Sequence, residues 1–213
     1  MTIAVKICGL RDAHAVAAAV DGGAAMVGFV FFPPSPRNIT PEQASALTKD
    51  VPEGVTRVGL CVDADDETLA DIVATAGIDM LQLHGSETPE RVKDIRERFG
   101  LPVMKALLVA TPEDVKTTAE YEAVADRLLF DAKPPKEATR PGGNAEAFDW
   151  SLVKDNSCNK PWLLAGGLTA ENLAEAVKTS GAEAVDVSSG VEDAPGIKSV
   201  EKIAAFLAAA KGL

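Results

Sequence analysis

The fold of this 213-residue chain is decided by the stretch from Trp162 to Glu192, which reads W-L-L-A-G-G-L-T-A-E-N-L-A-E-A-V-K-T-S-G-A-E-A-V-D-V-S-S-G-V-E. It contains two short apolar runs, Trp162–Ala165 and Ala184–Val187, and small residues follow each run. Between them lies an amphipathic segment, with Thr169 as the expected N-cap and Gly181 just past its end. The stretch therefore predicts a strand, a glycine turn, a helix, a second strand and a Gly/Ser turn.

The two turns predict a phosphate site. The first turn holds Gly166 and Gly167, and the second holds Ser188, Ser189 and Gly190. On neighbouring parallel strands such turns place backbone N–H groups side by side, and a following helix start adds a positive dipole. In eight-stranded α/β barrels the phosphate is frequently bound by the loops after strands 7 and 8, together with a short extra helix. The alternative is that the glycines only permit tight turns.

The rest of the chain repeats one unit, a short apolar run followed by a helical segment of alanines and charged residues. Strands are expected at Ile3–Ile7, Met26–Phe31, Arg57–Val62, Met80–Leu83, Val103–Leu107, Leu128–Asp131, Trp162–Leu164 and Ala184–Val187. Helices are expected at Asp12–Val20, Pro41–Lys49, Asp65–Thr75, Pro89–Arg98, Pro112–Ala125, Phe148–Lys154, Ala170–Thr179 and Val200–Ala210. Thr40, Thr88 and Thr111 each precede a proline, which is typical of an N-cap followed by the first helical residue.

Strands that alternate with helices imply parallel pairing and right-handed crossovers. Eight such units favour an α/β fold that closes into a single (β/α)8 TIM barrel, with residues 1–213 as one domain. An open doubly wound sheet is the alternative. It is disfavoured because no G-x-G-x-x-G sequence follows the first strand.

Composition narrows the classes of partner. The net charge is −11 and no basic stripe occurs, so we do not expect nucleic acid binding. No apolar run approaches the roughly 18 residues of a membrane span, so we expect no membrane partner. The three cysteines, Cys8, Cys61 and Cys158, lack metal-ligand spacing, and we expect no metal. Few cysteines also favour a reduced, cytoplasmic location.

The carboxyl ends of barrel strands carry the chemistry of this fold, and here they hold reactive side chains. Lys6 and Cys8 share one face at the end of the first strand, because strand side chains alternate. Arg37 follows a stiff proline loop after the second strand. Asp131 ends the sixth strand, before the long Pro- and Gly-rich loop Ala132–Ala147, which is a candidate lid.

Three further polar residues belong to strands four and eight: Gln82, His84 and Asp186. Each candidate also has a structural interpretation. Cys8 could be inert packing, Asp131 a loop cap and Arg37 a solvated surface residue. His84 could be a hydrogen-bonded structural histidine. Their shared position at strand ends of one predicted face favours a site.

The sequence resembles the phosphoribosylanthranilate isomerases, a family of tryptophan-pathway enzymes, along its whole length. The strings that carry the resemblance are K-I-C-G-L at Lys6–Leu10, S-P-R at Ser35–Arg37, Q-L-H-G at Gln82–Gly85, L-L-F-D at Leu128–Asp131, F-D-W at Phe148–Trp150, L-A-G-G-L at Leu164–Leu168 with Glu171-Asn172, D-V-S-S-G-V-E at Asp186–Glu192, and P-G-I-K at Pro195–Lys198. One departure is Gly142-Gly143-Asn144-Ala145, where the family usually has G-G-(S/T)-G. Ala145 resists the positive φ that glycine accepts.

The resemblance implies an Amadori rearrangement of N-(5-phosphoribosyl)anthranilate, a small-molecule substrate, without a cofactor. By similarity Asp131 is the general acid and Cys8, as thiolate, the general base. For work near neutrality the pKa of Cys8 would have to fall and that of Asp131 to rise.

The substrate-binding residues that the resemblance implies are Lys6, Arg37, Gln82, His84 and Asp186. Lys6 serves as an electrostatic aid, paired with Asp186 across the closure of the barrel. Arg37 is expected to bind the anthranilate carboxylate through its fork of N–H groups. We expect a monomer or a homodimer. The alternatives are another phosphoribosyl-binding barrel enzyme, or a catalytically inactive sensor of phosphoribosyl ligands.

Overall fold

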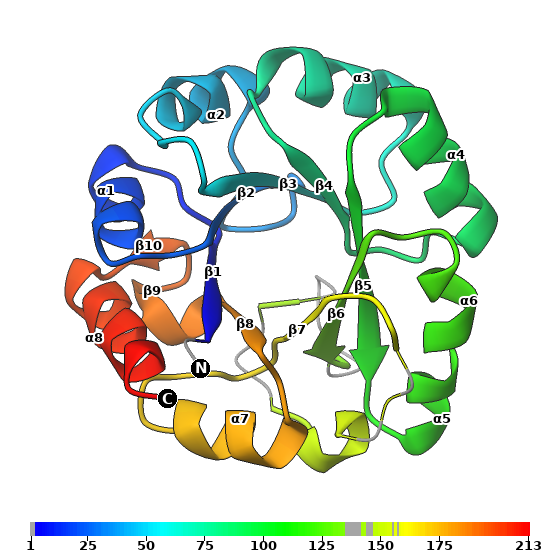
Figure 1. The fold of residues 1–213 in the computed structure, drawn as a ribbon. Coiled ribbons are helices and arrows are strands. Elements are labelled where there is room, and N and C mark those ends of the chain that lie inside the picture. Colours follow the sequence, from blue (N-terminus) through cyan, green and yellow to red (C-terminus); the bar gives the residue numbers. More distant parts are fainter. Residues whose placement is uncertain (1–2, 135–141, 144–146, 155, 157) are drawn as a thin grey trace.

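The strands form a closed parallel barrel, as the alternating pattern predicts. The computed structural model describes residues 3–134, 142–143, 147–154, 156 and 158–213. In it, β1 to β8 pair in sequence order and β8 pairs with β1. Figure 1 shows this ring of strands viewed down its length, with the helices arranged around the outside and α8 beside α1. The predicted TIM barrel is therefore confirmed.

The eight barrel strands are β1 (Ala4–Cys8), β2 (Met26–Phe31), β3 (Thr56–Cys61), β4 (Met80–Leu83), β5 (Val103–Val109), β6 (Arg127–Ala132), β7 (Trp162–Leu164) and β8 (Ala184–Val187). The helices are α1 (Ala13–Asp21), α2 (Pro41–Thr48), α3 (Asp66–Thr75), α4 (Pro89–Phe99), α5 (Pro112–Lys116), α6 (Thr118–Glu122), α7 (Leu173–Ser180) and α8 (Val200–Lys211). Two 3₁₀ turns, η1 (Trp150–Val153) and η2 (Ser189–Val191), and a hairpin of β9 (Glu192–Ala194) and β10 (Ile197–Lys198) complete the described elements.

Several helices begin and end at the capping residues that the sequence predicts. The side chain of Thr40 accepts from the backbone N–H of Gln43, and the Gln43 side chain accepts from the N–H of Thr40, which is a complete capping box. Thr88 caps α4 with its side chain alone, by accepting from the backbone N–H of Arg91. At the end of α7, Gly181 takes a left-handed conformation, with φ of 73°.

Three predicted helices differ from the structure. The expected helix Pro112–Ala125 is broken at Thr117, whose hydroxyl donates to the carbonyl oxygen of Asp114 and competes with the helical pattern. The expected helix Phe148–Lys154 is the single turn η1. Thr169 is not an N-cap, because α7 begins at Leu173 with Asn172 in the cap position.

The hairpin after β8 is an element that the sequence pattern does not reveal. β9 and β10 are antiparallel and lie outside the barrel, and they are joined through Pro195 and Gly196. Strands of three and two residues carry no recognisable alternation. The hairpin therefore appears only in the tertiary structure.

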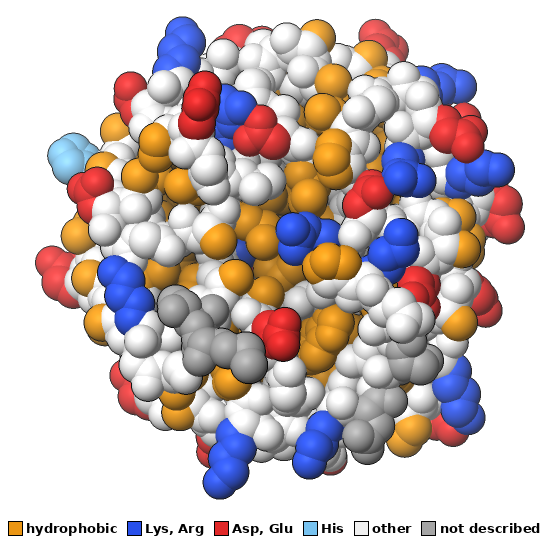
Figure 2. Space-filling model, in the orientation of Figure 1, with side chains coloured by type: hydrophobic (Ala, Val, Ile, Leu, Met, Phe, Trp, Pro, Cys, Tyr) orange, Lys and Arg blue, Asp and Glu red, His pale blue; other side chains and the backbone are white. Residues whose placement is uncertain are grey.

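Apolar side chains form two clusters, because strand residues alternate between the interior of the barrel and the helices. The inner cluster contains Met26, Val58, Met80, Met104 and Leu129 among others, and the larger outer cluster packs the strands against the helices. In the face seen in Figure 2, side chains of both charges surround a centre where apolar atoms are visible. Among the described residues, no helix has the length and apolar character needed to cross a membrane.

The closure of the barrel pairs two buried charges. In the β1–β8 register Lys6 lies opposite Asp186, and Lys6 Nζ donates to Asp186 Oδ1 at 2.9 Å. The Lys6 side chain is fully buried. A buried ammonium is costly without a partner, so the pair ties the last strand to the first at a fixed register.

Replacing Asp186 by Asn tests this closure. The variant leaves the Lys6 charge buried without a carboxylate, so the free energy of unfolding in urea should fall by about 3–5 kcal/mol. The exposed i,i+4 pair Lys93–Glu97 supplies the control, and Glu97→Gln should leave the free energy of unfolding unchanged within error. A loss for Asp186→Asn no larger than that of the control would contradict the role of the pair.

Candidate active site

One pocket gathers most of the predicted site residues at the carboxyl ends of the strands. Its volume, including the part open to solvent, is about 760 Å³. The predicted residues that line it are Cys8, Arg37, His84, Asp131, Gly166, Gly167, Asp186, Ser188, Ser189 and Gly190. Lys6 and Gln82 are fully buried and do not line it. These two residues therefore cannot contact a ligand in the pocket directly.

Cys8 and Lys6 lie at the end of β1, and Gly28 of β2 leaves room for both. A Cβ at Gly28 would come within 3.0 Å of Cys8 Sγ and 3.1 Å of Lys6 Nζ. Burial raises the pKa of the Cys8 thiol above its ordinary value, although the Lys6 ammonium acts in the opposite direction. The sequence-based expectation that the pKa of Cys8 falls is therefore wrong, because the desolvation of the thiolate outweighs the nearby charge.

The Lys6 ammonium stays charged in this environment. Burial alone would lower its pKa, but the charges of Asp186 and Cys8 together raise it above the ordinary value. Lys6 is thus a fixed positive charge beneath the pocket, next to the thiol.

His84 links β4 to Asp131 on β6. Gln82 Nε2 lies 3.0 Å from His84 Nδ1, and His84 Nε2 lies 3.2 Å from Asp131 Oδ2, without the angles of a hydrogen bond. If the Gln82 amide nitrogen donates to Nδ1, the ring proton of His84 is on Nε2, next to Asp131. Asp131 Oδ1 accepts from the backbone N–H of Ala132 at 2.8 Å. The carboxyl group is thereby held with its second oxygen beside the imidazole.

Arg37 is buried and has protein partners, so it is not the solvated residue that sequence alone allows. Nε donates to Glu192 Oε1 at 2.7 Å, and Nη2 donates to Glu192 Oε2 at 2.8 Å and to the Gly143 carbonyl oxygen at 3.3 Å. Gly9, with φ of 80°, leaves room for the Arg37 side chain, because a Cβ at this position would lie 2.6 Å from Arg37 Cδ. One edge of the predicted fork is therefore occupied by Glu192.

The glycine turn after β7 and the Gly/Ser turn after β8 meet at the pocket. Gly166 and Gly167 have φ of 88° and 65°, which only glycine adopts readily. At Gly190 a Cβ would overlap the carbonyl oxygen of Leu168, so the turns after β7 and β8 are in backbone contact. The Asn172 side chain accepts from Thr169 N–H at 2.8 Å and donates to the Gly167 carbonyl oxygen at 2.9 Å, and it closes the first turn.

Two described glycines of the long loop lie over the pocket. A Cβ at Gly142 would lie 2.7 Å from His84 Nε2 and 2.8 Å from Asp131 Oδ2. A Cβ at Gly143 would lie 2.5 Å from Arg37 Nη1. Most of the candidate lid Ala132–Ala147, including Ala145, lies outside the described residues.

Sequence reasoning missed two charged residues of this region, Glu192 and Lys198. Both lie in the short sequences that carry the family resemblance. A charged residue in such a sequence, with no role assigned to it, could have indicated that it belongs to the site. The remaining thiols lie apart from the pocket lining: burial raises the pKa of Cys61 to about 12, and Cys158 bonds the backbone of Lys160. No three His, Cys, Asp or Glu of the described ranges are grouped to hold a metal ion.

The arrangement brings a thiol, a carboxyl group and an imidazole to one pocket, with a guanidinium on one side and two backbone turns on the other. Such a set can move protons at a bound molecule and can hold two anionic groups at its ends.

The chain is similar in sequence and in fold to known proteins. Residues 5–209 match the family described as N-(5'-phosphoribosyl)anthranilate (PRA) isomerase. The N-(5'-phosphoribosyl)anthranilate isomerase of Paramagnetospirillum magneticum is 58% identical over 212 residues, covering 100% of this chain and 99% of the relative. The solved phosphoribosyl anthranilate isomerase of Thermotoga maritima is 37% identical, with a TM-score of 0.89 over 99% of this chain and 100% of that one.

A second solved phosphoribosyl anthranilate isomerase contains reduced 1-(o-carboxyphenylamino)-1-deoxyribulose 5-phosphate. It is 36% identical, with a TM-score of 0.85 over 99% of this chain and 100% of that one.

The pKa of Cys8 gives a test that needs no ligand. Because burial favours the neutral thiol, the rate of alkylation by iodoacetamide should rise with pH, with a midpoint above the value of about 8.5 for free cysteine. The rate is measured on the peptide that carries Cys8, by mass spectrometry of samples quenched over time. A midpoint at or below neutral pH would show that the charge of Lys6 lowers the pKa of Cys8 more than burial raises it.

Proposed function

The chain is an enzyme of the N-(5'-phosphoribosyl)anthranilate isomerase family, and from that premise we propose that it catalyses the Amadori rearrangement with Asp131 as general acid and Cys8 as general base. The product is 1-(2-carboxyphenylamino)-1-deoxyribulose 5-phosphate, on the route to tryptophan. The observation that carries this proposal is that Cys8, Asp131 and both Gly/Ser turns line one pocket.

The reaction needs two proton transfers at different atoms. Asp131 protonates the ring oxygen as the bond between that oxygen and carbon 1 breaks, and the nitrogen electron pair forms an iminium. Cys8 then removes the proton from carbon 2, which gives an enolamine that tautomerises to the ketone. The electrons move within the substrate, so the step is redox-neutral and calls for no cofactor.

Asp131 is suited to the acid role by its fixed geometry. One oxygen is occupied by the Ala132 N–H, and the other faces the pocket beside His84. His84 Nε2 is buried and has no hydrogen-bond partner among the described residues. It is thus available to donate to Asp131 or to a hydroxyl group of the sugar.

Cys8 is suited to the base role by its neighbours. Its raised pKa means that only a fraction of the thiol is ionised near neutrality, and that the thiolate, once formed, is a strong base. Lys6 and Lys198 both favour the thiolate electrostatically. Because Lys6 is paired with Asp186, its charge is held in place throughout the reaction.

The ends of the pocket match the two anionic groups of the proposed substrate. A phosphate is expected at the turns after β7 and β8, where backbone N–H groups converge. The carboxylate is expected at Arg37. Glu192 occupies the Nε/Nη2 edge of the guanidinium, so the carboxylate would bind Nη1 and the second N–H of Nη2, which donates to the Gly143 carbonyl oxygen in this structure. With both ends bound, carbon 2 is presented to sulfur and the ring oxygen to Asp131.

Substitution of the acid and the base tests the mechanism. Cys8→Ser and Asp131→Asn should each reduce kcat/KM by a factor on the order of 10²–10⁴, measured by the loss of anthranilate-type fluorescence with freshly made phosphoribosylanthranilate. Cys158→Ser, at a half-buried thiol away from the pocket, should keep wild-type activity. A fully active Cys8→Ser enzyme would exclude Cys8 as the base. A wild-type protein without turnover would favour the sensor or another barrel enzyme.

Binding of the phosphate can be followed separately, with ribose 5-phosphate as the probe. Titration should shift the backbone amide NMR signals of Gly166, Gly167 and Gly190, because their N–H groups would contact the phosphoryl oxygens. The amides of the exposed Gly54 and Gly100 serve as the control and should not move. Shifts absent from the two turns would place the phosphate elsewhere.

A further inference from the structure

The two hydrogen bonds that Arg37 makes to Glu192 fix the plane of its guanidinium. Both side chains are only 4% exposed, and the carboxylate meets Nε and Nη2 as a bidentate pair. We propose that Glu192 and Lys198 are positioning residues of the active site, which orient Arg37 through the hairpin β9–β10 so that its remaining N–H groups meet the carboxylate of the substrate. This inference rests on the proposed function for the nature of the ligand.

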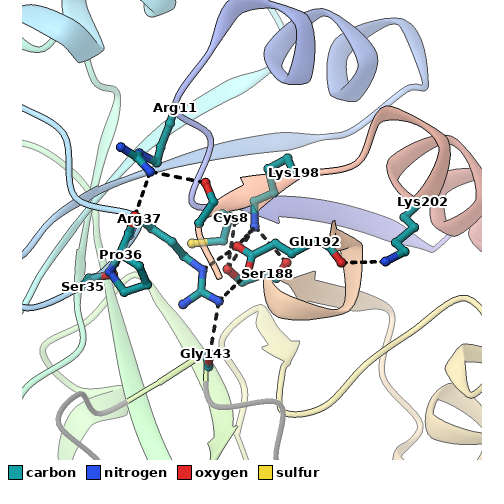
Figure 3. A network of polar contacts seen from close by, with 11 residues as sticks. Cys8, Arg11, Ser35, Pro36, Arg37, Gly143, Ser188, Glu192, Lys198 and Lys202 are labelled. Atoms are coloured by element: carbon teal, nitrogen blue, oxygen red, sulfur yellow. Dashed lines mark hydrogen bonds and ion pairs between the residues drawn. The ribbon is translucent and has the colours of Figure 1, made fainter. Parts of the chain in front are cut away.

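Lys198 also binds Glu192, through the same oxygen that accepts from Arg37 Nε. Its Nζ donates to Glu192 Oε1 at 2.8 Å and to the Ser188 carbonyl oxygen at 2.8 Å, while the Ser188 hydroxyl donates to the carbonyl oxygen of Cys8 at 3.1 Å. Figure 3 shows the resulting continuous network from Arg37 through Glu192 and Lys198 to Ser188, beside the sulfur of Cys8. The group proposed to hold the carboxylate and the strand end that carries the proposed base thus share one support.

The hairpin is itself clamped to the loop that carries Arg37. Arg11 Nη1 donates to the carbonyl oxygen of Pro36 at 2.9 Å and to that of Gly196 at 3.4 Å. A Cβ at Gly196, where φ is 81°, would overlap the carbonyl oxygen of Pro36. The hairpin turn and the proline loop are therefore in direct contact, and a shift of one is transmitted to the other.

Charge explains why a carboxylate is needed at this place. Arg37 and Lys198 are both buried and both donate to Glu192, whose charge opposes the lowering of the Lys198 pKa by burial. Burial would raise the pKa of Glu192, but the hydrogen bonds from Arg37 and the charge of Lys198 hold it below its ordinary value. A glutamine would offer one acceptor oxygen in place of two, and its NH₂ group would face a guanidinium N–H.

The consequence for the reaction is a specific effect on substrate binding. If Glu192 orients Arg37, Glu192→Gln should raise KM for phosphoribosylanthranilate by about 10-fold to 10²-fold, while kcat changes much less. Lys198→Met keeps the Arg37–Glu192 pair but removes the second anchor, so it should raise KM by a smaller factor. It should also lower kcat, because the Lys198 charge favours the Cys8 thiolate. If Glu192→Gln does not fold, Lys198→Met decides the question.

The matched control is Lys202→Met. Lys202 lies on α8 and also ties down the hairpin, but it does so from the half-exposed side, through the carbonyl oxygen of Glu192 at 2.7 Å and the Asp193 carboxylate at 3.0 Å. It does not contact the Glu192 carboxylate. Lys202→Met should therefore keep the Arg37–Glu192 pair and the wild-type kcat, even if it lowers Tm.

A readout that does not depend on turnover is the NMR signal of the Arg37 Nε–H, assigned by its absence in Arg37→Lys. In the wild-type protein this proton is buried in a charge-assisted hydrogen bond and should exchange slowly with water. Glu192→Gln should make the exchange much faster, Lys198→Met should make it moderately faster, and Lys202→Met should leave it unchanged.

Two results would overturn the inference, and they differ from failure of the proposed function. A Glu192→Gln enzyme with wild-type KM would show that the orientation of Arg37 does not matter for binding, while turnover by the wild type would still support the proposed function. An unchanged Nε–H exchange rate in Glu192→Gln would show that Glu192 does not hold Arg37. If the wild type has no turnover, the proposed function falls, and the exchange rate alone decides whether Glu192 positions Arg37.

Discussion

The structure depends on the pairing of Lys6 with Asp186 at the closure of the barrel. A lysine inside a barrel is tolerated only if an anion lies at the same level, and the β1–β8 register supplies one. A slip of one residue would turn Asp186 toward the helices and leave the ammonium unpaired. The ion pair therefore sets the register, and with it the place of Cys8 at the end of β1 and of Ser188 after β8.

Buried charge extends from this pair into the active site. Lys6, Arg37 and Lys198 are cationic, Asp186 and Glu192 are anionic, and all five side chains are largely buried. These five side chains together carry one net positive charge, and the proposed ligand of the neighbouring pocket carries a phosphate and a carboxylate. Burying such ions is costly and adds little stability by itself. Their value lies in orientation, since each side chain is held by partners from distant parts of the chain.

Close backbone approach is the second constraint on the site. Gly9 lets the Arg37 side chain pass, and Gly190 lets the turn after β8 touch Leu168. Neither position has room for a Cβ, so packing alone requires both glycines. For Gly190, the structural interpretation and the proposed phosphate site are therefore compatible, because both need a position without a side chain.

The sequence by itself determined the alternation of strands and helices and hence the barrel. Met26–Phe31, Met80–Leu83, Trp162–Leu164 and Ala184–Val187 are strands with the predicted bounds, since apolar runs and the turn residues that end them are local signals. The strand ends also identified most of the predicted residues that line the pocket, because parallel strands of a barrel all end on one face, but Lys6 and Gln82 are fully buried and do not line it. The roles of Cys8 and Asp131 came from family resemblance, as no periodicity specifies a proton transfer.

Only the tertiary structure decided what depends on contacts between distant residues. Arg37 and Glu192 are 155 positions apart, so no local pattern announces that one edge of the guanidinium is already bound. The short hairpin that carries Glu192 and Lys198 has too few residues for a recognisable period. The pKa of Cys8 rises where sequence reasoning expected a fall, because desolvation depends on the packing around the thiol, which is fixed only once the barrel has closed.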